Sequence, residues 1–155
     1  MKILSVDVQK MLAAALFGLV ASAGAGAAQE ATLTESSTDW AIYVVENPKE
    51  CFIVSAPTTW RAERGGQAVD VRRDDIRFYV SVIPSENVTN EPSFKAGYPL
   101  RNDGTVEMRI GSDSFTLFPN PDINPEYAWS KPEDDSGLIA AMRGGAEALV
   151  TGVSQ

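Results

Sequence analysis

The most constraining feature of this sequence is a pair of apolar segments joined by the turn dipeptide Asn47-Pro48, within residues 39–57. Residues 40–45 are apolar at every position, so a strand there would be apolar on both faces. Residues 51–56 form the second segment and contain the only cysteine, Cys51. Two apolar faces indicate strands inside a packed sheet rather than at an exposed edge, with Trp40 as a core residue.

Further short segments with a period of two follow along the chain, and turn residues separate them. Residues 76–83 alternate cleanly, residues 93–97 do so more weakly, and residues 106–110 lead through a tight turn at 111–113 into another strand. A short strand is expected at 68–72 and a last one at 146–153. This spacing predicts an all-β sandwich or barrel.

One helix is expected near the C-terminus. Ser130 and Glu133 fit a capping box, and Gly144-Gly145 supply the stop. The preceding segment, residues 119–132, carries four prolines and is expected to be irregular.

The N-terminus reads as a targeting segment. Residues 1–28 combine a basic start, an apolar run at 11–20 and a small-residue stretch at 21–28, which predicts a cleaved secretory signal peptide. The apolar run is shorter than the roughly 20 residues that a bilayer-spanning helix needs, so no integral membrane anchor is expected after cleavage. Residues 29–38 are polar and are expected to form a flexible leader, and residues 39–155 form the domain.

Charge and composition exclude several functions. The chain of 155 residues has a net charge of −8, and removing residues 1–28 leaves 11 basic and 20 acidic side chains, a net charge of −9. An acidic domain repels the phosphate backbone, so no nucleic-acid partner is expected. The sequence contains no histidine, so it lacks both the usual general base near neutral pH and the commonest zinc ligand.

Cys51 is the first candidate for chemistry, but a cysteine nucleophile needs a base to form the thiolate. In an oxidising compartment a lone cysteine is a free thiol, half of an intermolecular bridge, or a residue whose partner is missing. Residues 120–126 carry oxygen-bearing side chains at alternate positions, but they lack the glycine and distal glutamate of a calcium loop. No catalytic residue, metal or cofactor is predicted.

A cluster of arginines is the remaining candidate site. Four acidic residues lie among these arginines. The five basic side chains fall within seventeen positions and are Arg61, Arg64, Arg72, Arg73 and Arg77. One interpretation is a contact site for anionic lipid headgroups or for an acidic patch on a partner, and the other is a hairpin surface of mixed charges.

The order of several short motifs resembles the invasion-associated locus B family. The motifs are Asp39-Trp40, Glu50-Cys51, Val54-Ser55-Ala56-Pro57, Arg72-Arg73-Asp74-Asp75-Ile76, Gly97-Tyr98-Pro99 and the run at 140–148. The resemblance covers residues 39–155 and implies an exported protein of Gram-negative bacteria, periplasmic or associated with the outer membrane, with an immunoglobulin-like β-sandwich. Members usually continue further with another strand and a terminal helix that carries a second cysteine. The resemblance therefore implies a shortened C-terminus and a disulfide in which Cys51 has lost its partner.

Three hypotheses about function follow. The first is a non-enzymatic envelope or surface protein of this type, sometimes linked to host-cell invasion, which contacts an envelope or host-cell component. The second is a periplasmic small-ligand-binding or chaperone-like module with a pocket lined by Trp60, Trp129 or Tyr127. The third is a hydrolase, which requires carboxylates from separate strands to converge.

Overall fold

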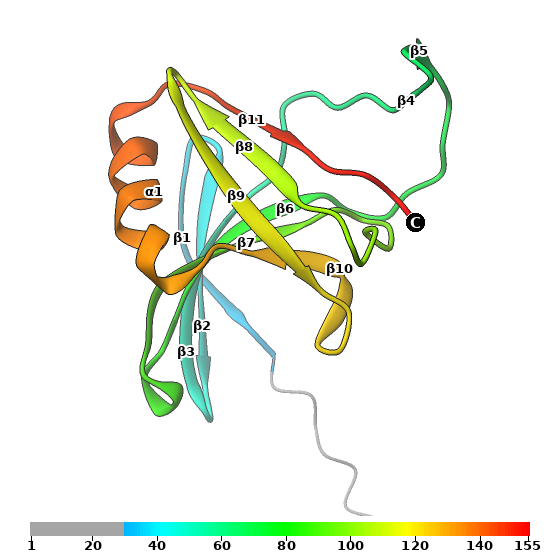
Figure 1. Cartoon of the computed structure of the whole chain (residues 1–155). Coiled ribbons are helices and arrows are strands. Elements are labelled where there is room, and N and C mark those ends of the chain that lie inside the picture. Colours follow the sequence, from blue (N-terminus) through cyan, green and yellow to red (C-terminus); the bar gives the residue numbers. More distant parts are fainter. Residues whose placement is uncertain (1–29) are drawn as a thin grey trace, which may run out of the picture.

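The computed structural model describes residues 30–155, which contain eleven strands and one α-helix (Figure 1). The predicted signal peptide at 1–28 lies outside the described residues. The strands are β1 (Thr32–Ser37), β2 (Trp40–Glu46), β3 (Lys49–Ser55), β4 (Glu63–Arg64), β5 (Gln67–Ala68), β6 (Arg77–Ile83), β7 (Val88–Lys95), β8 (Val106–Ile110), β9 (Asp113–Asn120), β10 (Asn124–Trp129) and β11 (Ala148–Thr151). A 3-10 turn, η1 (Pro84–Glu86), precedes β7, and α1 (Pro132–Gly144) precedes β11.

Nine of the strands form one antiparallel sheet in the order β1-β2-β3-β6-β7-β10-β9-β8-β11, and β4 pairs with β5 apart from it. Near-neighbours along the chain are joined mainly by tight turns, which suits antiparallel pairing. The predicted all-β, sandwich-like fold with one helix near the C-terminus is confirmed.

The core lies on one side of β6, β7 and β10. Strand β9 crosses in front of β6 and β7, β8 and β11 lie in order beside it, and α1 flanks these strands (Figure 1). The buried apolar side chains that form the core are Ile76, Phe94, Ala96, Leu100, Val106, Met108, Ile110, Leu117, Ala128 and Leu138. On β8 the buried residues alternate with exposed or half-buried ones, as a strand covered on one face requires.

The hairpin of β2 and β3 forms as predicted, with Val44 opposite Cys51, but its place in the core was predicted wrongly. Every apolar side chain of β2 and β3 is half-buried, and Trp40 does not belong to the core cluster. The hairpin pairs with β1 and β6, so it is not an edge. Its two apolar faces therefore reflect partial cover on both sides rather than complete burial.

The leader predicted at 29–38 is wrong for residues 32–37, which form β1 along the edge of the sheet. All six side chains of β1 are exposed. Because the strand buries no face, its sequence needs no alternation of apolar and polar residues. The strand is defined by its backbone pairing with β2. Its threonine and serine side chains are polar and suit an edge strand that faces water.

The prediction that residues 119–132 are irregular is also wrong, because β9 runs to Asn120 and β10 occupies half of the remainder. The ladder between them is irregular from Asn124 to Ala128, and Pro125 lies inside that irregularity, where it displaces no regular ladder donor. Asn124 Oδ1 accepts the backbone N–H of Glu126 at 3.0 Å, so this side chain closes the turn.

The start of the helix differs by one residue from the prediction. Lys131 is the N-cap and Pro132 is the first helical residue, whereas Ser130 Oγ donates to Asp135 Oδ1 at 2.5 Å. The helix ends at Gly144, so the predicted stop is confirmed. No helix within residues 30–155 is both long and apolar enough to cross a membrane.

Candidate functional site

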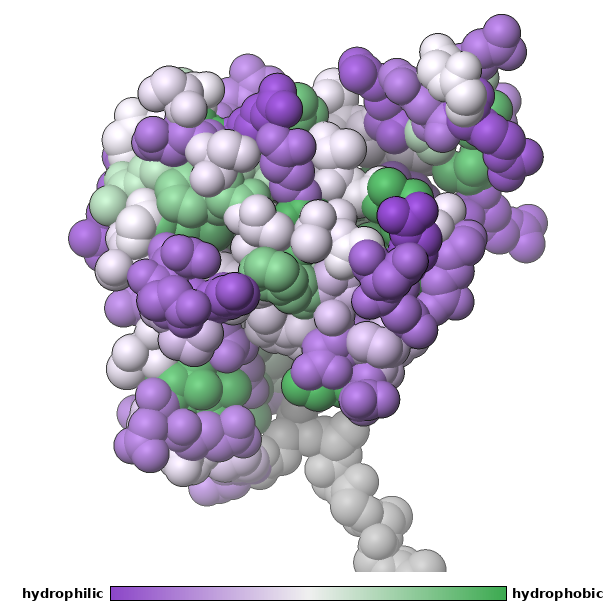
Figure 2. Space-filling view, in the orientation of Figure 1, coloured by the Kyte–Doolittle hydropathy of each residue, from purple (hydrophilic) through white to green (hydrophobic). Residues whose placement is uncertain are grey.

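A long connection between β3 and β6, here called the arm (residues 57–75), projects from the sheet (Figure 1). Its only regular structure is the two-residue pair β4 and β5, which turns at Gly65 and Gly66 with φ of +59° and +79°. Figure 2 shows that the arm is mainly hydrophilic. Because connections beyond about 15 residues are uncommon in compact domains and are often functional, the arm is the first candidate site.

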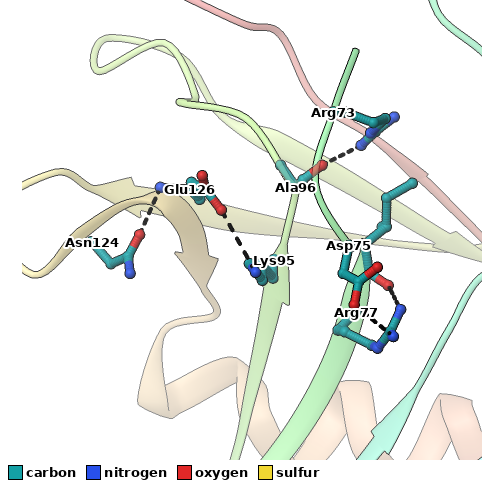
Figure 3. Close-up of polar contacts among 8 residues, drawn as sticks. Arg73, Asp75, Arg77, Lys95, Ala96, Asn124 and Glu126 are labelled. Atoms are coloured by element: carbon teal, nitrogen blue, oxygen red, sulfur yellow. Dashed lines mark hydrogen bonds and ion pairs between the residues drawn. The ribbon is translucent and has the colours of Figure 1, made fainter. Parts of the chain in front are cut away.

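Arg73 attaches the base of the arm to the sheet. Its guanidinium lies between two aromatic rings, 4.9 Å from the centre of Trp60 and 4.8 Å from that of Tyr98. Its Nη2 donates to the carbonyl oxygen of Ala96, which follows β7 (Figure 3). Burial lowers the pKa of Arg73, because a desolvated cation is less stable than a hydrated one. Within residues 30–155 its Nε is buried without a hydrogen-bond partner.

Gly97 allows the arm to pass close to the end of β7. Asp74 donates its backbone N–H to the carbonyl of Gly97 at 2.9 Å. Gly97 has φ of +74°, and a Cβ there would lie 2.3 Å from the backbone oxygen of Asp74. Only glycine combines this backbone conformation with this close approach.

A hollow of about 670 Å³, here called the cationic cleft, lies at the base of the arm. Its lining residues are Ala56, Pro57, Trp60, Arg73, Asp74, Asp75, Ile76, Arg77 and Lys95. Arg77 and Lys95 face each other across β6 and β7 and therefore project on the same side. Arg77 pairs with Asp75 at 3.0 Å, and Lys95 lies 3.8 Å from Glu126 (Figure 3). The volume falls in the range of small-ligand sites.

The structure divides the five predicted arginines into two groups. Arg73 and Arg77 line the cleft, whereas Arg61, Arg64 and Arg72 are exposed on the arm. Arg61 pairs with Glu63 at 2.8 Å, and an exposed pair of this kind contributes little stability. The cluster is therefore neither a uniform basic patch nor a plain hairpin surface.

Two contributors to the site, Lys95 and Tyr98, were missed by reasoning from sequence. Lys95 is the last residue of β7, the strand that pairs with β6, and Tyr98 follows it, so the register of β6 and β7 brings both to the arm. Trp60 lines the cleft, as the small-ligand hypothesis expected, but Trp129 and Tyr127 do not. Asp74 and Asp75 precede β6, and both line the cleft.

Trp129 and Tyr127 belong instead to an aromatic row, which crosses the sheet on the face opposite the core. The row consists of Tyr43, Phe52, Tyr79, Tyr127 and Trp129, with centres of successive rings 5.4 to 6.0 Å apart. Between Tyr79 and Trp129 the intervening strand β7 places Ser93, whose small side chain lets rings from β6 and β10 meet. Most pairs are stacked, so the rings cover one another's faces and the row stabilises the sheet.

Burial raises the pKa of Tyr127 to about 12, and the neighbouring Tyr79 adds to the shift. A phenol in this environment keeps its proton throughout the neutral range. Tyr127 is therefore an uncharged phenol and offers neither a base nor a nucleophile.

Cys51 lies on β3 between Val44 of β2 and Val82 of β6, and it is half-buried with a free thiol. It lines neither the cationic cleft nor the second hollow described below. Its predicted disulfide stays a prediction, because the chain holds no other cysteine.

A second hollow of about 490 Å³ lies between β7 and α1 and contains Glu91 and Asp135. Burial raises the pKa of Glu91, and the charges of Asp135 and Glu86 add to the shift. Asp135 accepts a hydrogen bond from the Ser130 hydroxyl in the first turn of α1, where the helix dipole stabilises a carboxylate. Asp135 therefore has a structural role at the start of the helix.

Among residues 30–155, no group of three or more His, Cys, Asp or Glu side chains could hold a metal ion. No family model, curated protein or solved structure matches the chain. The geometry of the arm and its cleft thus carries the functional argument.

Proposed function

We propose that this chain is an exported, non-enzymatic protein of the invasion-associated locus B type, which works in the cell envelope or at the cell surface by contacting another envelope or host-cell component. The observation that carries the proposal is the arm: an exposed, charged projection held at its base by the contacts of Arg73. A rigid scaffold that presents a polar loop is the usual arrangement of a binding protein.

Two further observations support a role in binding rather than catalysis. The chain contains no histidine, and its one thiol lies outside both hollows. Export is supported by the pattern of residues 1–28, a basic start followed by an apolar run and small residues. The small-ligand function remains a second candidate, because Trp60 and several polar side chains converge in the cationic cleft.

Site-specific cross-linking in the living Gram-negative host tests the proposal. A photo-reactive residue replaces Arg64 at the arm, and a matched control replaces Asp122, which is exposed in the turn between β9 and β10. We expect the protein in the periplasmic or outer-membrane fraction, with a discrete cross-linked species from position 64 and none from position 122. Retention in the cytoplasm, or equal cross-linking from both positions, would contradict the proposal.

A further inference from the structure

The cationic cleft holds a cation that lacks a compensating charge. No carboxylate among residues 30–155 lies within 4.0 Å of the Arg73 guanidinium, although Arg77 and Lys95 each have an acidic neighbour. Two rings lie within 5 Å of the half-buried Arg73 guanidinium, and among residues 30–155 the Ala96 carbonyl is its only hydrogen-bond acceptor. A desolvated guanidinium with spare donors gains free energy when an anion reaches it.

The charges around the cleft limit the anion that it can hold. Three cations line the cleft with the carboxylates of Asp74 and Asp75, and Glu126 lies 3.8 Å from Lys95 beside it, so Arg73 is the cation without a close carboxylate. A monoanion at Arg73 brings one negative charge near these three carboxylates, whereas a dianion would bring two and be repelled more strongly. Because the protein as a whole is acidic, a second negative charge would also be repelled at longer range.

The remaining lining is apolar and partly flat. Ala56, Pro57 and Ile76 supply aliphatic surface, and Trp60 is 51% exposed. A ring or other planar group attached to the anion would cover this surface while its charge faced the cations.

We propose that the cationic cleft binds a small organic monoanion, a carboxylate carried on a planar apolar body. This ligand class goes beyond the proposed contact function, since the cleft lies at the base of the arm and can bind a small molecule whether or not the arm contacts a partner. Arg73, Arg77 and Lys95 provide the charge, and Trp60 provides the apolar contact.

Titration of the mature full-length chain with benzoate, followed by two-dimensional NMR, tests the ligand class. We expect shifts confined to residues lining the cleft, with a Kd of about 1 mM for so small a probe. Benzyl alcohol, which has the ring without the charge, should bind at least about tenfold more weakly, and so should dianionic phenyl phosphate. Equal binding of benzyl alcohol or phenyl phosphate, or shifts spread over other surfaces, would overturn the proposal.

Two variants that leave the Arg73 contacts in place give effects of opposite sign. Lys95→Gln removes one lining cation and should weaken benzoate binding about fivefold. Asp75→Asn releases Arg77 from its carboxylate partner, which is 75% exposed, and should strengthen binding about threefold. Arg101→Gln, a matched exposed arginine that pairs with Asp103 outside the cleft, should change nothing. Identical affinities for all of these variants would overturn the assignment of the cleft.

The two proposals fail in distinguishable ways. If benzoate causes no NMR shifts but the chain still cross-links from position 64, the ligand class is overturned and the contact surface is retained. Benzoate binding without any arm-specific cross-link overturns the contact function and retains the cleft as a ligand site.

Discussion

The two halves of the large sheet differ in how completely they bury their apolar side chains. Strands β6 to β11 pack around buried side chains, and every fully buried apolar residue of the described chain lies between Ile76 and Leu138. The hairpin of β2 and β3 is equally apolar in sequence, yet its side chains are only half-buried, and β1 beside it is exposed throughout. The apolar content of a strand therefore does not show whether it belongs to the core. A strand belongs to the core when a second layer of structure covers its apolar side chains.

The largest expected effect compares the same substitution in the two halves. Ile110 in β8 is 4% exposed, whereas Ile53 in β3 is half-buried. Ile110→Ala should lower the free energy of unfolding by about 3 kcal/mol, and Ile53→Ala by about half as much, since water can enter the hairpin site. Chemical denaturation measures both. Equal losses would show that the hairpin is part of the same core.

A smaller effect is expected at the arm. Arg73→Ala removes two cation–π contacts and a hydrogen bond, so opening of the arm should become easier by about 1.4 kcal/mol. Trypsin cleavage after Arg61 and Arg64 should then be roughly tenfold faster, because cleavage follows the population of the open form. The neighbouring Arg72 is exposed and makes none of these contacts, so Arg72→Ala should leave the rate unchanged. Similar rates for both variants would show that Arg73 does not hold the arm.

A third effect, confined to high pH, concerns the aromatic row, which runs from the hairpin into the packed half. Tyr127 has a pKa of about 12 in the folded chain against an ordinary value of 10.0. The folded state therefore keeps this proton more tightly, and the stability that it provides below pH 10.0 is lost as the pH rises to about 12. Denaturation between about pH 9 and about pH 12 should show this decline, and Tyr127→Phe should reduce it. An identical decline in the variant would assign it to other groups.

The sequence predicted those elements whose own residues carry the signal. Strands β6 and β8 alternate strictly, and glycines mark the end of α1. Strands β1 and β10 were missed because their pairing depends on neighbouring strands: β1 has no buried face, and β10 tolerates Pro125 only at an irregular point of the ladder. Local pattern cannot reveal an element that its partners define.

The candidate site shows the same limit. Arg73, Arg77 and Trp60 were singled out from sequence, but a list of arginines cannot say which one lies half-buried beside two rings and which are exposed. Lys95 and Tyr98 reach the site only through the register of β6 and β7, a long-range property of the sheet. A cluster of charges in a sequence therefore locates a surface. It does not show which residue fixes the arm to the sheet, which residues line the cationic cleft and which are exposed on the arm.

The close crossing at Gly97 has a consequence for how the arm can be altered. Both fixed points of its base, Gly97 and the Arg73 contacts, lie next to the sheet, whereas the turn at Gly65 and Gly66 has open space around it. Lengthening an exposed turn adds only a slowly growing closure entropy. The arm is thus a natural grafting position, at which a foreign peptide can be displayed while the domain beneath it keeps its own sequence.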